Sequence, residues 1–285
     1  MSALRVDAHH HVWDLAVLDQ PWTRALPVLH RSFAFEELAP QLRAAGIDAT
    51  VVVQTAAVRA ETEALVRLAA QRPEIAGVVG WVDLTDPGVA DRIAALRDSA
   101  WGGALVGVRH SVQALADGGW LARPEVRRGL SAVGEHHLAY DLLVRWDQLP
   151  AAVTVAAAHP GLRFVLDHAG KPDIVSGDIE PWARHVVALA RQPNVAVKLS
   201  GLTGAAGAGW TTAALEPCVT VLLEAFGPRR ILFGSDWPVC LLSATYCEVV
   251  EAAEELTGRL SVQERERVFG GTAVEWYGLP GRATR

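Results

Sequence analysis

The chain has 285 residues, of which 51% are hydrophobic and 20% are charged. This composition provides enough apolar material for a large core and excludes a disordered chain. The formal net charge of −6 argues against a protein that binds nucleic acid or an anionic membrane surface, and no apolar run approaches the ~20 residues of a membrane helix.

The start of the chain and its cysteines bear on the cellular compartment. The first β-prone run begins at Arg5, and no basic segment followed by an apolar one precedes it, so we expect no signal peptide. The three cysteines, Cys218, Cys240 and Cys247, form no CxxC pair. This usage is typical of a reduced, cytoplasmic protein without a structural zinc site on cysteine.

Eight short β-prone runs recur along the chain. Most are continuously apolar, which is typical of parallel strands buried on both faces. They start roughly 25 to 45 residues apart, enough for a helix and two loops in each unit. The runs are Arg5 to Ala8, Thr50 to Gln54, Val78 to Val82, Leu105 to Arg109, Tyr140 to Val144, Arg163 to Asp167, Val195 to Leu199 and Ile231 to Gly234. The pattern predicts an α/β fold, a (β/α)8 TIM barrel that forms one domain over residues 1–285.

Helix signals lie between these runs. Asp86-Pro87 is a helix start, and Gly46 is a helix end after an apolar-periodic segment. Ser261 with Glu264 predicts a capping box for a late helix. The glycine-rich segment from Gly201 to Gly209 reads as a flexible loop after the seventh strand, and we expect it beside the active site.

The first strand ends in three consecutive histidines. Because side chains alternate along a strand, His9 and His11 are predicted to share one face and His10 to lie on the other. Two imidazoles on one side can bind a divalent metal or donate hydrogen bonds to a substrate carbonyl. The alternative, an exposed histidine-rich turn, is weaker because a buried strand precedes them.

Asp236 follows the eighth run, within Gly234-Ser235-Asp236-Trp237-Pro238. A carboxylate there can accept a proton from an attacking water and return it to the leaving group. The structural alternative is an aspartate that caps the next helix. His168, after the sixth run, is predicted to be a further ligand or a carbonyl-polarising group, against the alternative of a loop histidine with satisfied ring nitrogens.

Polar and aromatic side chains follow every predicted strand, at the end of a barrel where catalysis takes place. We interpret nine of them as substrate-binding residues. The cations among them could bind a carboxylate or hydroxyls of the substrate, and the tryptophans could pack against a sugar or planar ring. The nine residues are Arg109, His110, Arg145, Lys171, Lys198, Trp13, Trp81, Trp237 and Gln54. Arg109 and His110 are neighbours on a strand, so we expect at most one of them to face the barrel axis.

The motifs, in this order and over nearly the whole chain, resemble the amidohydrolase superfamily, and within it the lactonases of sugar acids and of 2-pyrone-4,6-dicarboxylate. The matching segments are Val6 to Asp14, Gly107 to His110, Asp167 to Pro172, Val197 to Gly201 and Phe233 to Pro238. The HxH pair alone is a weak indication. Together with DHAGKP and GSDWP it is a strong one. The resemblance implies a barrel, a hydrolytic reaction and catalytic roles for His9, His11, His168 and Asp236.

The resemblance also bears on a metal. The two-metal members of the superfamily use a bridging lysine at the end of strand four, where this chain has Arg109-His110. This difference argues against a binuclear centre. Two alternatives remain, one divalent ion (zinc or manganese) on His9, His11 and Asp236 with help from His168, or no metal cofactor.

These observations favour a hydrolase that opens the lactone ring of a sugar acid or a related carboxylated small molecule. Asp236 activates the water, and the three histidines polarise the carbonyl. Two other functions are open: a metal-dependent decarboxylase of an aromatic or unsaturated acid, and a binding barrel that has lost catalysis. The expected partner is a small-molecule substrate, and the sequence leaves open whether the chain forms a homo-oligomer.

Overall fold

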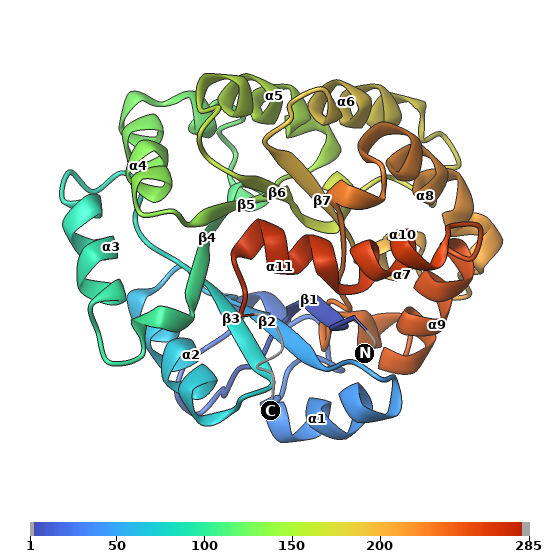
Figure 1. The fold of residues 1–285 in the computed structure, drawn as a ribbon, viewed down its shortest axis with the longest axis horizontal. Helices are drawn as coiled ribbons and strands as arrows, with labels where there is room; N and C mark the ends of the chain where they lie inside the picture. Colours follow the sequence, from blue (N-terminus) through green and yellow to red (C-terminus); the bar gives the residue numbers. More distant parts are fainter. Residues whose placement is uncertain (1–2, 281–285) are drawn as a thin grey trace.

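Eight parallel strands follow one another around a barrel in the computed structural model, which describes residues 3–280. Each strand pairs with the next one in the chain (Figure 1). The strands are β1 (Val6–His10), β2 (Ala49–Val53), β3 (Ile75–Gly80), β4 (Leu105–Ser111), β5 (Ala139–Leu143), β6 (Phe164–Leu166), β7 (Val195–Leu199) and β8 (Ile231–Phe233). Each overlaps one predicted run, so the (β/α)8 barrel is confirmed. The single-domain prediction also included residues 1–2 and 281–285, which lie outside the described residues.

The barrel closes between the first and the last strand. His10 and Trp237 form a parallel bridge, and the amide of His11 donates to the Trp237 carbonyl at 2.7 Å. The amide of Asp236 donates to the His9 carbonyl at 2.8 Å. The backbone on both sides of this seam therefore belongs to the residues predicted to be catalytic.

Helices surround the strands (Figure 1). They are α1 (Phe35–Ala44), α2 (Arg59–Gln71), α3 (Val89–Arg97), α4 (Pro124–Glu135), α5 (Leu149–Ala158), α6 (Glu180–Ala190), α7 (Leu202–Ala206), α8 (Thr212–Phe226), α9 (Tyr246–Leu256), α10 (Val262–Glu266) and α11 (Thr272–Tyr277). None of the described helices is long and apolar enough to cross a bilayer. The Ser261–Glu264 capping box is confirmed. The glycine-rich segment that was predicted to be a flexible loop contains helix α7 instead. Helix α3 does not start at Asp86-Pro87 as predicted but three residues after Asp86, whose carboxylate accepts from the Gly88 amide.

Small apolar side chains fill the amino-terminal half of the barrel. They are Val6, Ala8, Ala49, Val51, Val53, Val79, Val106, Ala139, Val165, Ala196 and Leu232. Helix α11 lies across this opening (Figure 1), and its residues Trp276 and Tyr277 join the same interior cluster. Trp276 donates from Nε1 to the carbonyl of Phe164, the first residue of β6. The polar residues therefore occupy the opposite, carboxyl-terminal half.

The pairing of β1 is irregular near the three histidines at its end. The pairing with β2 shifts between Asp7 and His10. His9 and His11 lie 3.2 Å apart at their Nε2 atoms, whereas His10 bonds Thr50 at 3.0 Å and packs beside Phe35 of α1. The predicted division of faces is confirmed. His10 is a buried histidine between the barrel and its helices.

Buried His10 makes stability depend on pH. Burial, and then the neighbouring His11, lowers the pKa of His10 from 6.5 to about 3. Between these values the unfolded chain binds a proton that the folded chain does not, so the free energy of unfolding falls as the pH falls. We expect His10 to contribute a loss of about 1.4 kcal/mol per pH unit below 6.5. Chemical denaturation of wild type and His10→Gln from pH 7 to 4 measures it, and identical slopes would contradict the prediction.

Candidate active site

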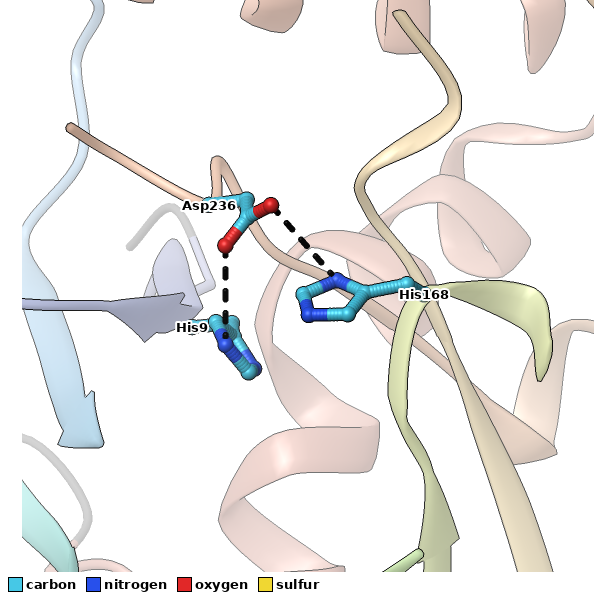
Figure 2. A group of neighbouring side chains, drawn as sticks. All are labelled: His9, His168 and Asp236. Atoms are coloured by element: carbon cyan, nitrogen blue, oxygen red, sulfur yellow. Dashed lines mark ion pairs between the residues drawn. The ribbon is translucent and has the colours of Figure 1, made fainter. Parts of the chain in front are cut away.

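Three histidines and one aspartate meet at the carboxyl-terminal end of the barrel. Asp236 lies between His9 and His168 (Figure 2): its Oδ1 is 3.7 Å from His9 Nε2, and its Oδ2 is 3.8 Å from His168 Nδ1. His11 Nε2 lies 3.5 Å from the same Oδ1. All four side chains are buried. The structure thus brings together the four residues predicted to be catalytic, at or just beyond the carboxyl ends of β1, β6 and β8.

Unusual backbone conformations position two of these side chains. Asp236 has a φ of 59°, and His168 begins four consecutive residues of positive φ that end at Lys171. A left-handed conformation costs an L-residue about 1–2 kcal/mol, so surrounding contacts must stabilise this turn. Trp182 Nε1 donates to the Ala169 carbonyl at 2.6 Å, and His168 Nδ1 lies 3.0 Å from Ser200 Oγ. The turn aims His168 at Asp236.

Gly201 makes room for His168. Its φ is +68°, and a Cβ on Gly201 would lie 2.9 Å from both Cβ and Nδ1 of His168. We expect Gly201→Ala to displace the imidazole and to lower kcat by about tenfold or more.

Gly204, in the same short helix α7, provides the control, because a Cβ there meets nothing within 4 Å. Gly204→Ala should leave kcat unchanged and raise the thermal midpoint slightly, since alanine favours a helix by roughly 0.5–1 kcal/mol. Steady-state rates and melting curves of both variants are the measurement. Equal rates in the two would show that the close contact of Gly201 with His168 is unimportant.

A network of buried charges lies beneath the cluster. Lys198 Nζ donates to Asp141 Oδ2 at 2.5 Å and lies 3.0 Å from His9 Nδ1 and 2.9 Å from Asp167 Oδ1. Arg109 Nη1 donates to Asp167 Oδ2 at 2.9 Å. The predicted cations Lys198 and Arg109 therefore face the barrel axis, but carboxylates pair with both. Asp141 and Asp167 are site residues that the sequence-based set did not include.

Burial keeps His9 and His168 neutral, and the surroundings of Asp236 keep it ionised. Burial is the main cause of the lowered pKa of His9, and the charge of Lys198 lowers it further. Burial likewise lowers the pKa of His168, to about 4. Burial alone would raise the pKa of Asp236, but His168 and the other nearby imidazoles outweigh it and lower the value. At neutral pH the cluster thus has one carboxylate that can accept a proton and imidazoles that can donate hydrogen bonds or bind a metal.

The donor atoms fit a divalent metal ion. His9, His168 and Asp236 offer ligand atoms that all lie within 4.8 Å of one another. His11 Nε2 lies 3.2 Å from His9 Nε2 and 3.5 Å from Asp236 Oδ1, close enough for these three atoms to share one ion at the about 2.0–2.2 Å bond lengths of zinc. Imidazole nitrogen and carboxylate oxygen are suitable ligands for zinc and for other divalent first-row transition metals such as manganese.

Other predicted substrate-binding residues form an aromatic and amide rim. Trp81 donates from Nε1 to His110 Nδ1 at 3.0 Å, and the His110 ring stacks on Trp120 at 4.3 Å. Trp120 belongs to the same group but was not predicted. Gln54 donates to the Arg109 carbonyl at 3.1 Å, which ties the end of β2 to the end of β4.

The structure places three predicted binding residues away from the cluster. Arg145 is exposed and pairs with Asp147 at 3.0 Å. Trp237 is only 1% exposed and packs edge-on against Phe33. Trp13 lines a separate apolar cavity of about 420 Å³ between the segment after β1 and helix α2. These side chains contribute to the surface and to the core.

The two lysines of the chain, Lys171 and Lys198, both belong to the site. Lys171 is half-buried; burial lowers the pKa of its ammonium, whereas the charge of Asp236 raises it. Unlike Lys198, it has no carboxylate at ion-pair distance among the described residues. Lys171 is therefore the cation of the site that is left for a ligand.

The fold and the cluster together define a TIM-barrel protein with an acid–base site at the carboxyl ends of its strands. The chain belongs to the amidohydrolase family, whose sequence model matches residues 6–279. It is 39% identical to the L-fucono-1,5-lactonase of Burkholderia multivorans over 98% of both chains. It is 38% identical to that of Burkholderia ambifaria over 96% of this chain and 95% of the relative. A crystal structure of an amidohydrolase from Burkholderia multivorans with bound zinc matches with a TM-score of 0.92 and 39% identity, covering 98% and 100% of the two chains. The family resemblance predicted from the motifs is confirmed.

Proposed function

We propose that the protein hydrolyses the ester bond of an uncharged sugar-acid lactone, the class to which L-fucono-1,5-lactone belongs. The observation that supports this most is Asp236, an ionised carboxylate between imidazoles of His9 and His168 at the catalytic end of the barrel. The two lactonase relatives match the chain over nearly its full length. Neither the decarboxylase nor the binding-barrel alternative has comparable support.

In the proposed reaction Asp236 accepts a proton from water as the water oxygen attacks the lactone carbonyl carbon. Hydrogen bonds from the imidazoles stabilise the negative charge that develops on the carbonyl oxygen. The bond from the carbonyl carbon to the ring oxygen then breaks, and Asp236 returns its proton to that oxygen. The product is the open hydroxy acid.

A single divalent ion, zinc or manganese, is an optional part of this proposal. His9, His11 and Asp236 would bind it with His168 nearby, and it would polarise the lactone carbonyl as a Lewis acid. Asp167 Oδ1, 3.3 Å from His9 Nδ1, could accept a hydrogen bond from that ring nitrogen and so orient His9 if the ring were to hold a metal.

The charges of the site favour a neutral substrate. Arg109 and Lys198 are paired with buried carboxylates, and Arg145 is paired with Asp147 at the surface. Only Lys171 is left to bind an anionic group. A lactone with two carboxylates would bury at least one of them without a partner, at a considerable cost. A sugar lactone presents hydroxyls, which need no such partner.

Proton release from a panel of neutral aldonolactones, with and without prior chelation, tests the function. We expect turnover, and a kcat/KM at least about 100-fold higher than for 2-pyrone-4,6-dicarboxylate, a difference of about 2.7 kcal/mol. Turnover that survives chelation would exclude an essential metal, and turnover restored by zinc or manganese would establish one. No turnover of any lactone would reject the proposed function, and carbon dioxide release from an aromatic acid would favour the decarboxylase.

A further inference from the structure

Helix α11 reaches the charge network from the far end of the barrel. The helix lies across the amino-terminal opening of the barrel (Figure 1), whereas the cluster of His9, His11, His168 and Asp236 lies at the carboxyl ends of the strands. The Tyr277 hydroxyl donates to both carboxylate oxygens of Asp141, at 2.9 and 2.8 Å. Among the described residues, only Tyr277 and Lys198 donate to the carboxylate of Asp141. Tyr277 thus contacts the network on which the position of Lys198 depends.

The hydrogen-bond directions beyond Lys198 can be assigned from one fixed acceptor. His11 Nδ1 lies 2.7 Å from the carbonyl oxygen of Val53, which can only accept, so Nδ1 has the proton. In the neutral His11 ring, Nε2 is then an acceptor. His9 Nε2 has two polar neighbours, His11 Nε2 at 3.2 Å and Arg109 Nη1 at 3.4 Å, and two lone pairs facing each other at the shorter contact would repel. His9 Nε2 therefore donates to His11, which leaves His9 Nδ1 to accept from Lys198 at 3.0 Å.

A second tautomer of His9 has a ready partner. Asp167 Oδ1 lies 3.3 Å from His9 Nδ1 and accepts no well-directed hydrogen bond from the described residues, although Lys198 Nζ is 2.9 Å away. If Lys198 withdraws, His9 Nδ1 can take the proton and donate to Asp167. His9 Nε2 then presents a lone pair to the site instead of an N–H.

We propose that Tyr277 is a positioning residue for the active site: through Asp141 and Lys198, its hydroxyl determines which ring nitrogen of His9 has the proton. While Tyr277 donates to Asp141, part of the carboxylate charge is compensated and Lys198 stays within reach of His9. Without that hydroxyl, Asp141 has Lys198 as its sole donor and draws it away from the imidazole. The kinetic consequence rests on the proposed lactonase function, because an N–H at His9 Nε2 is what stabilises the oxyanion when no metal is bound.

Tyr277→Phe tests the proposal, because it removes the hydroxyl and keeps the ring. Trp276→Phe is the matched control: it removes a hydrogen bond of the same helix, to the Phe164 carbonyl at 3.0 Å, without touching the network. In chelated protein we expect Tyr277→Phe to lower kcat by about tenfold while KM changes by less than about twofold. Trp276→Phe should leave both unchanged. Equal kcat values in wild type and Tyr277→Phe would overturn the positioning role.

Nitrogen NMR of the side chains provides a readout that needs no substrate. In protein labelled with ¹⁵N at histidine, the ring signals of His9, assigned by their loss in His9→Gln, should move toward the tautomer protonated at Nδ1 in Tyr277→Phe only. In a second sample labelled with ¹⁵N at lysine, of which the chain has two, the Nζ signal of Lys198 should shift while that of Lys171 stays. Unchanged His9 signals in a folded Tyr277→Phe protein would overturn the proposal. Because the spectra do not depend on turnover, a failure of the proposed lactonase function is distinguishable from a failure of this inference.

Discussion

Replacing Asp236 with asparagine should reduce lactone turnover by about 10²–10⁴-fold, the factor that general acid–base catalysis contributes. The amide is nearly the same size as the carboxylate but cannot accept a proton from water. Folding should be preserved, because Asp236 has a φ of 59° and asparagine is among the residues that best tolerate this left-handed conformation. Steady-state kinetics and a melting curve test both statements.

Asp83→Asn is the matched control for this variant. Asp83 is exposed, follows β3 at the same end of the barrel, and accepts from the Thr85 amide and hydroxyl. Its amide variant should retain wild-type kcat. An Asp236→Asn enzyme within about threefold of wild type would remove Asp236 from the mechanism and would require another base for the same rate enhancement.

Lys198→Met should lower the free energy of unfolding by about 3–5 kcal/mol, the cost of breaking a buried ion pair by removing one partner. The ammonium is fully buried and lies within ion-pair distance of Asp141 and Asp167. Without it, Asp141 is an uncompensated charge inside the barrel. Urea denaturation measures the loss, and a change below about 1 kcal/mol, as for a surface pair, would contradict the prediction.

The double variant Lys198→Met with Asp141→Asn separates charge from packing. Both charges of the pair are then absent, while Asp167 keeps Arg109 as its partner at 2.9 Å. If the unpaired carboxylate is the cause, the double variant should be more stable than Lys198→Met alone. If lost packing is the cause, the two substitutions should destabilise additively.

The barrel and the catalytic cluster follow from patterns that the sequence displays locally. Eight apolar runs of strand length predict the barrel, and the alternation of side chains predicts that His9 and His11 share one face while His10 lies on the other. The position of His168 and Asp236 after buried strands then determines that they meet the histidines, because strand ends of one barrel lie on one rim.

The ion pairs were not predictable in the same way. Asp141 lies in an apolar strand segment, and its partner Lys198 is 57 residues further along the chain. A carboxylate inside a buried strand needs a cation as its partner. Because the chain has only two lysines, few residues could be that partner, and these two facts together were the sequence evidence for the ion pair. It would have shown that Lys198 is paired within the protein.

Side chains next to turns were the least predictable. Trp237 directly follows Asp236, yet it packs into the core, whereas Arg145 follows β5 and turns outward to Asp147. Strand periodicity ends where the strand ends, so the direction of the next side chain depends on loop conformation. The position of the His110 ring could not be predicted either, because it stacks on Trp120, a residue of the loop that follows β4.

The seam between β1 and β8 has a consequence for the synthesis of the chain. The amides that close the barrel belong to His11 and Asp236, so the site is complete only where the barrel is closed. A ribosome that has made the first seven units has produced most of the chain but no catalytic centre. If Asp236 is the general base, as proposed, products terminated before β8 lack it, and we expect them to be inactive.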